Sequence, residues 1–226
     1  MFIGHYGVAF VLKKYVPRLS LGVLFLTVQL VDIVFFIFLP LGIENARIIP
    51  DFTAANAFDL YDFPITHSLV GSFAWAVAVY LLFRFVTLKN STGTEFEMNR
   101  IALAMGIGVL SHYALDFLVH TPDLLLIPGF DMKIGLGLWN SIPATILLEL
   151  AILLIGGWIY FQSSSGTRVG RRYGWSVLLI VLIIFTILTP FQSFPDMLTV
   201  AVVSEFLYIA FALAAFWLDS QGSDAI

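Results

Sequence analysis

The chain has 226 residues, of which 60% are hydrophobic and 12% are charged, whereas a soluble domain usually carries about 25% charged residues. Its net charge is −4 and it contains no cysteine, which excludes disulfides and cysteine-built zinc sites. No run of basic residues forms the stripe that is typical of nucleic-acid-binding proteins, so we expect no nucleic-acid partner.

Long apolar segments predict an all-α integral membrane protein with one membrane domain over residues 1–226. A helix needs about 20 residues to cross a bilayer. About six segments approach this length and are predicted to span the membrane, at 20–40, 66–88, 100–121, 135–161, 174–194 and 197–218. The apolar segment 2–13 is too short to span. It is either a half-helix that dips into the membrane or a helix that lies flat on it.

The basic residues predict the orientation, because Lys and Arg concentrate in cytoplasmic loops. All but two of the eleven, Arg47 and Lys133, fall in loops on one side of the predicted bundle. They are Lys13, Lys14, Arg18, Arg84, Lys89, Arg100, Arg168, Arg171 and Arg172. We therefore expect a multi-pass protein of the cell (inner) membrane with both termini in the cytoplasm. The longest outer loop, 41–65, is rich in Pro and Asp, which predicts irregular structure and a possible lid.

The segment 100–121 holds three ionisable residues at helical spacing. His112, Asp116 and His120 are spaced i, i+4 and i+8, which places them on one face of a helix. A neighbouring pair at i and i+4 can hold one metal ion, as paired histidines do in helical zinc sites. All three would have to reach across about 12 Å of helix to share an ion.

Two further predicted spans contribute a carboxylate and an imidazole at a similar depth. Asp32 and His67 both fall in the outer half of the membrane in this topology, and His5 joins them only if the N-terminal segment dips in. Thr66 is expected to cap the helix that begins at His67. A mixture of His and carboxylate ligands suits zinc or manganese. A bound ion would activate water for attack on an ester or phosphoester.

Simpler interpretations exist for each polar residue. A membrane histidine often makes only structural hydrogen bonds, and Asp32 alone could bond a Ser or Thr. Glu149 and Glu205 are expected to pair with Asn140, Ser141 or Ser204, or to form the floor of the same cavity. The pair Gly156 and Gly157 indicates close helix packing.

Two other functions compete with hydrolysis. One is a small ion-coupled transporter or permease, in which four carboxylates relay a proton or cation: Asp32, Asp116, Glu149 and Glu205. The other is a non-catalytic membrane scaffold, in which the polar cluster only fixes helix packing.

Four short motifs occur in order over roughly residues 1–125: Gly4-His5, Gln29-Leu30-Val31-Asp32, Ile65-Thr66-His67-Ser68 and Leu110-Ser111-His112-Tyr113-Ala114-Leu115-Asp116. This series resembles bacterial membrane-bound metal-dependent hydrolases. The resemblance implies metal-site roles for His5, Asp32, His67, His112 and Asp116.

The chain departs from this family pattern at two positions. Only Asp32 stands where the family has two aspartates, and Asp62-Phe63-Pro64 stands where it has a first His-Arg. Two ligands of a two-metal site are therefore missing, and His120 and Asp123 are the residues that could replace them. The resulting hypothesis is a metal-dependent hydrolase in the outer half of the membrane, acting on a lipid or lipid-linked substrate. Its core ligands are Asp32, His67, His112 and Asp116, with His5 and His120 as additional candidates.

Overall fold

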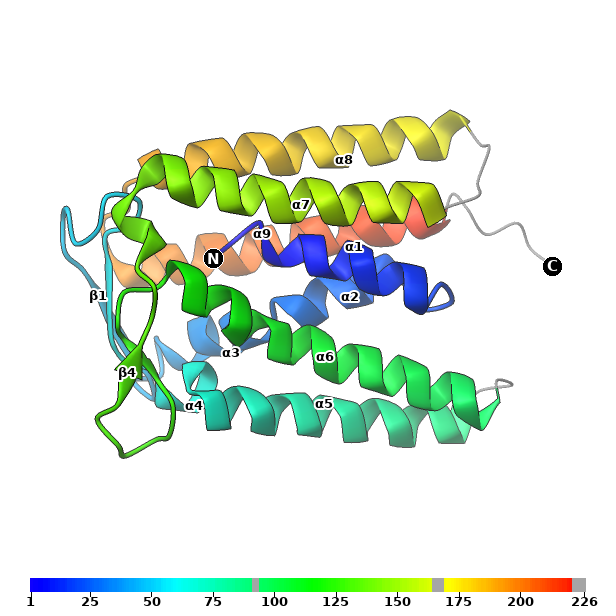
Figure 1. Ribbon diagram of the computed structural model, residues 1–226, viewed down its shortest axis with the longest axis horizontal. Helices are drawn as coiled ribbons and strands as arrows, with labels where there is room; N and C mark the ends of the chain where they lie inside the picture. The colour runs from blue at the N-terminus through cyan, green and yellow to red at the C-terminus, as the bar shows by residue number, and fades with distance from the viewer. Residues whose placement is uncertain (91–93, 164–168, 221–226) are drawn as a thin grey trace.

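The computed structural model describes residues 1–90, 94–163 and 169–220, which are mostly helical. The long helices run along one axis, and the short strands and loops gather at one end (Figure 1). The helices are α1 (His5–Tyr15), α2 (Leu21–Val28), α3 (Leu30–Phe38), α4 (Pro64–His67), α5 (Leu69–Asn90), α6 (Glu95–Val119), α7 (Ile142–Ser163), α8 (Val169–Leu188) and α9 (Met197–Ser220), with short 3-10 turns η1 (Leu138–Asn140) and η2 (Thr189–Phe191).

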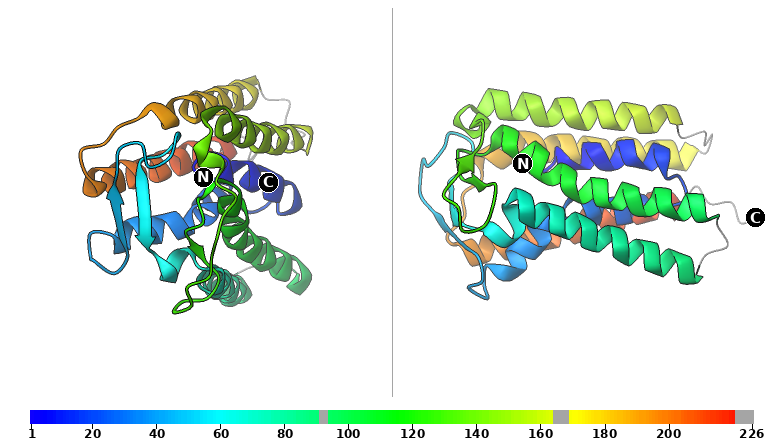
Figure 2. Two further views of the ribbon diagram at one scale, coloured as in Figure 1. Left: turned by 60° about the vertical axis from the view of Figure 1, so that its left-hand side comes forward. Right: turned by 60° about the horizontal axis from the view of Figure 1, so that its bottom comes forward.

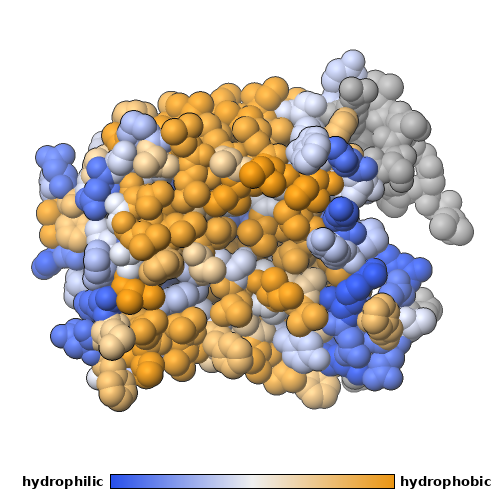
Figure 3. All heavy atoms as spheres, viewed as in Figure 1, coloured by the Kyte–Doolittle hydropathy of each residue, from blue (hydrophilic) through white to orange (hydrophobic). Residues whose placement is uncertain are grey.

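The described helices are those of a membrane protein. Four of them, α6, α7, α8 and α9, are long and apolar enough to cross a bilayer, and α2 with α3 makes a fifth if the bent pair is one span. The apolar part of α5, Leu69–Phe85, is shorter. Hydrophobic side chains cover the middle of the molecule between two hydrophilic ends (Figure 3). The membrane class is confirmed, whereas six spans and a membrane position for the N-terminal helix stay predictions.

The predicted span 20–40 is broken into two helices. Helix α2 begins at the cap Ser20, whose side chain accepts a hydrogen bond from the Gly22 N–H. Helix α3 follows after Gln29 at an angle of 53°. The buried Gln29 amide donates to the carbonyl of Phe2 at 2.8 Å. The break therefore ties α2 and α3 to the chain that enters α1.

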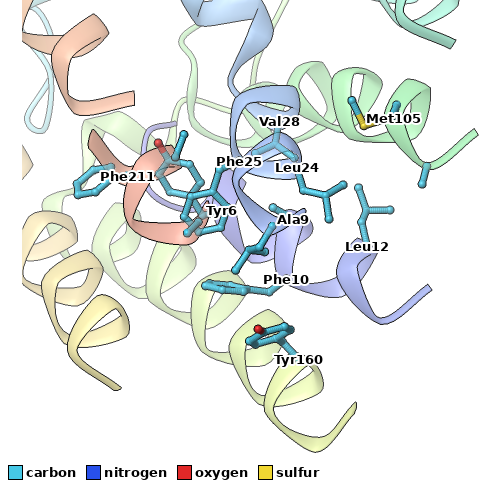
Figure 4. Packing of buried hydrophobic residues seen from close by; sticks show 14 of the residues in the cluster. Tyr6, Ala9, Phe10, Leu12, Leu24, Phe25, Val28, Met105, Tyr160 and Phe211 are labelled. Atoms are coloured by element: carbon cyan, nitrogen blue, oxygen red, sulfur yellow. The ribbon is translucent and has the colours of Figure 1, made fainter. Parts of the chain in front are cut away.

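Helix α1 lies inside the bundle, in contact with α2, α6 and α7, and not flat on its surface (Figure 2). Its Tyr6 and Phe10 are fully buried and pack against Phe25 of α2 (Figure 4). A Cβ built on Gly156 of α7 would lie 2.1 Å from the carbonyl oxygen of Gly7. The two backbones touch at these glycines, which confirms the close helix packing predicted for this part of α7.

Two antiparallel hairpins cover one end of the bundle (Figure 2). Strand β1 (Asn45–Ile48) pairs with β2 (Phe58–Asp62), and β3 (Leu124–Leu125) pairs with β4 (Lys133–Ile134). An ion pair of 2.7 Å between Arg47 and Asp59 joins the first hairpin across its strands. The prediction of irregular structure for 41–65 was therefore wrong for the two strands, because their backbone groups pair with each other.

The described basic residues of the predicted cytoplasmic loops lie at the other end of the bundle, where α1 ends and α6 begins (Figure 1). Lys13 pairs with Asp219 at 2.9 Å, and Arg18 pairs with Glu97 at 2.8 Å. Arg168 lies outside the described residues, as do the side chains of Lys89, Arg171 and Arg172. This segregation is what the predicted orientation requires; the orientation itself stays a prediction.

Two of the predicted span boundaries move by several residues. Helix α6 begins at Glu95 instead of 100, because the Thr94 side chain caps it by accepting the Glu97 N–H. The span expected from 135 begins as a helix only at Ile142, after Gly135 and Gly137 adopt positive φ angles of 157° and 71°.

Candidate metal centre

Five of the residues that the sequence singled out lie together in the interior of the bundle, near the end that carries the hairpins. They come from four helices: His5 from α1, Asp32 from α3, His67 from α4, and His112 and Asp116 from α6. Two sets of three have ligand atoms within 4.8 Å of one another, namely His5, His112 and Asp116, and Asp32, His67 and His112. Both sets use His112, so its imidazole stands at the centre of the cluster.

Asp116 offers its two carboxylate oxygens to different partners. Its Oδ2 lies 3.1 Å from Nε2 of His112, 3.7 Å from Nε2 of His67 and 3.6 Å from Nε2 of His120. Its Oδ1 lies 3.3 Å from Nε2 of His5 and accepts a hydrogen bond of 2.5 Å from the backbone nitrogen of Met1. Asp116 is therefore the carboxylate around which the imidazoles are arranged.

The break between α2 and α3 orients His112. The carbonyl of Val28, in the last turn of α2, lies 2.8 Å from Nδ1 of His112. Last-turn carbonyls lack partners within their own helix. Because a carbonyl oxygen only accepts, Nδ1 donates its proton to Val28 and Nε2 faces the cluster. That Nε2 is buried, has no hydrogen-bond partner, and lies 3.3 Å from Oδ1 of Asp32.

His67 is oriented by a carboxylate that acts through a hydroxyl. Its Nδ1 lies 2.7 Å from Oγ1 of Thr66, which donates its own proton to the buried Glu44 at 2.6 Å. Nδ1 therefore donates to Thr66, and Nε2 faces the cluster. Such outer partners fix the tautomer and ring orientation of metal-binding histidines. The predicted capping role of Thr66 was wrong: Ser68 caps α5 by accepting the Gly71 N–H at 2.9 Å.

His120 reaches the cluster by leaving the helix. Helix α6 ends at Val119 and the backbone of His120 is extended. The His120 ring therefore approaches Asp116, whereas in a continuous helix it would lie about 12 Å along the axis from His112. Its Nδ1 lies 3.0 Å from Oδ1 of Asp123, and its ring packs against that of Trp139, with centroids 4.2 Å apart and planes tilted by 39°. His120 approaches Asp116 but belongs to neither set of three.

His5 has the least satisfied imidazole of the cluster. Its ring stacks on that of His112, with centroids 3.9 Å apart and planes within 7°. The ring is fully buried, and neither nitrogen has a hydrogen-bond partner. Buried polar groups are normally hydrogen-bonded, and coordination of a cation by Nε2, which lies 3.3 Å from Oδ1 of Asp116, would satisfy this imidazole.

Asp32 is held from both sides. Its Oδ1 lies 3.2 Å from Nε2 of His67, and its Oδ2 accepts a hydrogen bond of 3.1 Å from the Tyr208 hydroxyl. Sequence reasoning missed both Tyr208 and Glu44. A hydroxyl-bearing aromatic in the interior of an apolar span, away from the interfacial belts where Tyr usually lies, is a signal for Tyr208. Nothing in the loop sequence singles out Glu44.

Of the two other membrane carboxylates, Glu149 lines the cavity described below, as one of its two expected roles required, but its hydrogen-bond partners differ from those expected. Glu149 binds the start of α1, because its Oε2 accepts from the N–H groups of Ile3 and Gly4 at 2.9 and 3.0 Å. It does not pair with Asn140 or Ser141. The Oε1 atom of Glu205 is buried without a hydrogen-bond partner. Glu149 therefore helps to position His5, while Glu205 lies outside both sets of three.

A cavity of about 470 Å³ borders the cluster. Its walls include residues of α3, α9, the β1–β2 loop and the α8–α9 connection, and Asp32, His67, Asp116 and His120 line its base. A molecule in the cavity would therefore contact the atoms of the cluster directly. Cavities of small-molecule sites span about 300–1,000 Å³.

The chemistry of the cluster fits a divalent ion. Buried carboxylates are costly unless they are paired or coordinate a metal. Among the described residues, no Lys or Arg side chain pairs with Asp32 or Asp116, and their partners are imidazoles, a phenol and the Met1 nitrogen. Nitrogen and oxygen ligands of this kind suit zinc or manganese.

Replacing Tyr208 with phenylalanine tests the position of Asp32. The variant removes the hydrogen bond to Oδ2 and is expected to weaken metal affinity by about 10–100-fold, as loss of other outer partners does. Competition with a chromophoric chelator measures this. Tyr173→Phe is the control, because Tyr173 is 69% exposed. Equal affinities in the two variants would show that Tyr208 does not act on the site.

Comparison with protein-family models, curated proteins and solved structures gave no match to this chain. The case for a function therefore depends on the geometry of the cluster and its cavity.

Proposed function

We propose that this protein is a membrane-embedded, metal-dependent hydrolase that acts on an ester or phosphoester, with a lipid or lipid-linked molecule as substrate. One observation carries the proposal: four histidine Nε2 atoms lie within 3.1–3.7 Å of the Asp116 carboxylate, next to a cavity of substrate size. The motif series, which resembles that of bacterial membrane-bound metal-dependent hydrolases, supports the same proposal.

One zinc or manganese ion is the expected cofactor. His112 belongs to both sets of three, and its Nδ1 is bound to the Val28 carbonyl. Only its Nε2 is left to bind a metal, so the two sets cannot hold an ion each through His112. Asp32 and His67, or His5 and Asp116, complete the ligand set, and His120 stands beside it. When bound, the ion polarises the substrate oxygen and makes its bound water acidic enough to act near neutral pH. Glu44, Thr66, Asp123 and Tyr208 hold the ligands in place.

The proposed site lies in the outer half of the membrane, with the C-terminal end of α9 on the cytoplasmic side; Met1, which was expected in the cytoplasm, lies at the site itself and binds Asp116. The cluster is at the hairpin end of the bundle, away from the described basic pairs such as Arg18 with Glu97. The cavity wall includes apolar residues of α3 and α9, which belong to candidate spans. A substrate that resides in the bilayer would therefore reach the cluster without crossing the whole membrane.

A carboxylate relay for ion-coupled transport has less support. Glu149 would be one of its four members, yet its oxygens are occupied by backbone N–H groups at the start of α1. A scaffold role leaves the buried Nδ1 atom of His5, which has no hydrogen-bond partner, unexplained.

Metal removal tests the proposal. The purified protein is expected to contain about one zinc or manganese ion per chain, since structural and catalytic sites of this ligand type bind tightly. Hydrolysis of chromogenic acyl and phosphate esters should fall after chelation and return when the ion is restored. Metal content is measured by mass spectrometry of the digested protein. Activity that survives complete chelation would contradict the proposal.

A further inference from the structure

The cavity beside the cluster has an unusual charge for a site that hydrolyses a phosphorylated molecule. Its lining in the described part of the chain contains no Lys or Arg, although it contains Asp32, Asp51, Asp116 and Glu149. Phosphate groups in proteins are commonly bound by Arg, Lys or free backbone N–H groups at helix ends. These cations are missing from the walls that surround the substrate space.

The backbone groups that could replace them are already engaged. Helix α1 begins next to the cluster, but Glu149 accepts the N–H groups of Ile3 and Gly4 at its start. At the start of α9, Asp196 accepts the N–H of Thr199 at 2.7 Å, which lowers the pKa of Asp196 and keeps it charged. Met1 also lines the cavity, and its ammonium group is a cation, but this group is fully buried and already paired with Asp116. Both helix ends are therefore occupied by a carboxylate of the protein itself.

The rest of the lining combines neutral polar and apolar side chains. Hydroxyl and amide groups are present, and the apolar part extends along α9 into a candidate span. The neutral polar residues include Thr145, Gln192 and Ser204, and the apolar ones include Phe36, Val203 and Leu207. Such walls suit a molecule with an apolar chain and an uncharged polar head.

We propose that the substrate is an uncharged amphiphile whose scissile bond is a carboxylic ester, and not a phosphorylated lipid. This inference rests on the proposed hydrolase function and narrows its substrate class. One divalent ion balances the charges of Asp32 and Asp116, and the Glu149 carboxylate balances the Met1 ammonium beside it, so the site as a whole offers no net positive charge to an anionic head. In the reaction, water adds to the ester carbonyl carbon and the bond to the alkoxy oxygen breaks. The alkoxy oxygen takes a proton, so that a carboxylic acid and an alcohol form.

Equilibrium binding of two probes that cannot be hydrolysed tests the substrate class separately from activity. Radiolabelled 1-O-dodecylglycerol is uncharged, and dodecylphosphonate carries the same chain with an anionic head. Binding is measured to the zinc-loaded protein in nanodiscs of uncharged lipid. Val203→Trp fills the cavity, whereas Val202→Trp adds the same side chain to a neighbouring position that is 62% exposed. Probe binding that is lost in Val203→Trp and kept in Val202→Trp takes place in the cavity.

We expect cavity binding of dodecylglycerol to be at least about tenfold tighter than that of dodecylphosphonate, because an anion buried without a partner is costly. Equal or tighter binding of the phosphonate would overturn the inference. So would binding of both probes that is unchanged in Val203→Trp, and so would a failure of both probes to bind. Failure of the proposed function is separate, because it appears as a protein without stoichiometric metal or as hydrolysis that survives chelation.

Discussion

Replacing Asp116 with asparagine is expected to reduce metal affinity by more than about 100-fold, a larger effect than loss of an outer partner, and to abolish hydrolysis. The side chain keeps its size but loses the charge that faces four imidazoles, each with an Nε2 atom within 3.7 Å. His112→Ala should have the same effect, because both sets of three include His112. Metal content after gel filtration is the measurement.

Asp131→Asn provides the matched control for this substitution, since Asp131 is an exposed carboxylate in the loop between β3 and β4. It should keep full metal content and activity. If Asp116→Asn and His112→Ala both retain the metal of the unaltered protein, the ion is bound elsewhere and the assignment of the ligands is wrong.

Gly156→Ala is expected to destabilise the protein by about 1–3 kcal/mol or more, the range found when a packed core is overfilled. The new Cβ would lie 2.1 Å from the carbonyl oxygen of Gly7, and backbone cannot move aside as a side chain can. Helix α1 would have to shift away from α7. Because α1 carries His5, the variant should also bind metal more weakly.

Gly157→Ala is an internal control one residue further along the same helix. Its Cβ would lie 3.3 Å from the Trp175 side chain and would meet no backbone atom of α1. Thermal unfolding in detergent compares the two variants. Similar midpoints for both would show that α1 and α7 do not touch at these glycines.

The sequence was most informative about features that depend on residues close together in the chain. Apolar length and low charge predicted the membrane class, and the i, i+4 spacing placed His112 and Asp116 on one face of a helix that the structure contains. The order of the short motifs singled out His5, Asp32 and His67 as well. Ionisable residues are so costly in membrane segments that their positions stand out from the apolar background.

Contacts between distant segments were beyond such reasoning. The break at Gln29 and the hydrogen bond from His112 to Val28 join α2 to α6, and no local pattern announces them. Glu44 and Tyr208 likewise act only through partners that are 22 and 176 residues away. Glu149 was expected to bond nearby polar side chains, but the buried start of α1 offered it backbone N–H groups instead.

The X-ray absorption fine structure of the zinc-loaded protein tests most directly whether the histidine and aspartate cluster holds a metal ion. We expect a shell of nitrogen and oxygen atoms at about 2.0–2.1 Å with the outer-shell scattering of at least two imidazole rings. In His112→Ala that imidazole contribution should decrease. A shell of oxygen atoms alone, unchanged in His112→Ala, would show that the ion binds to carboxylates or water away from the histidines.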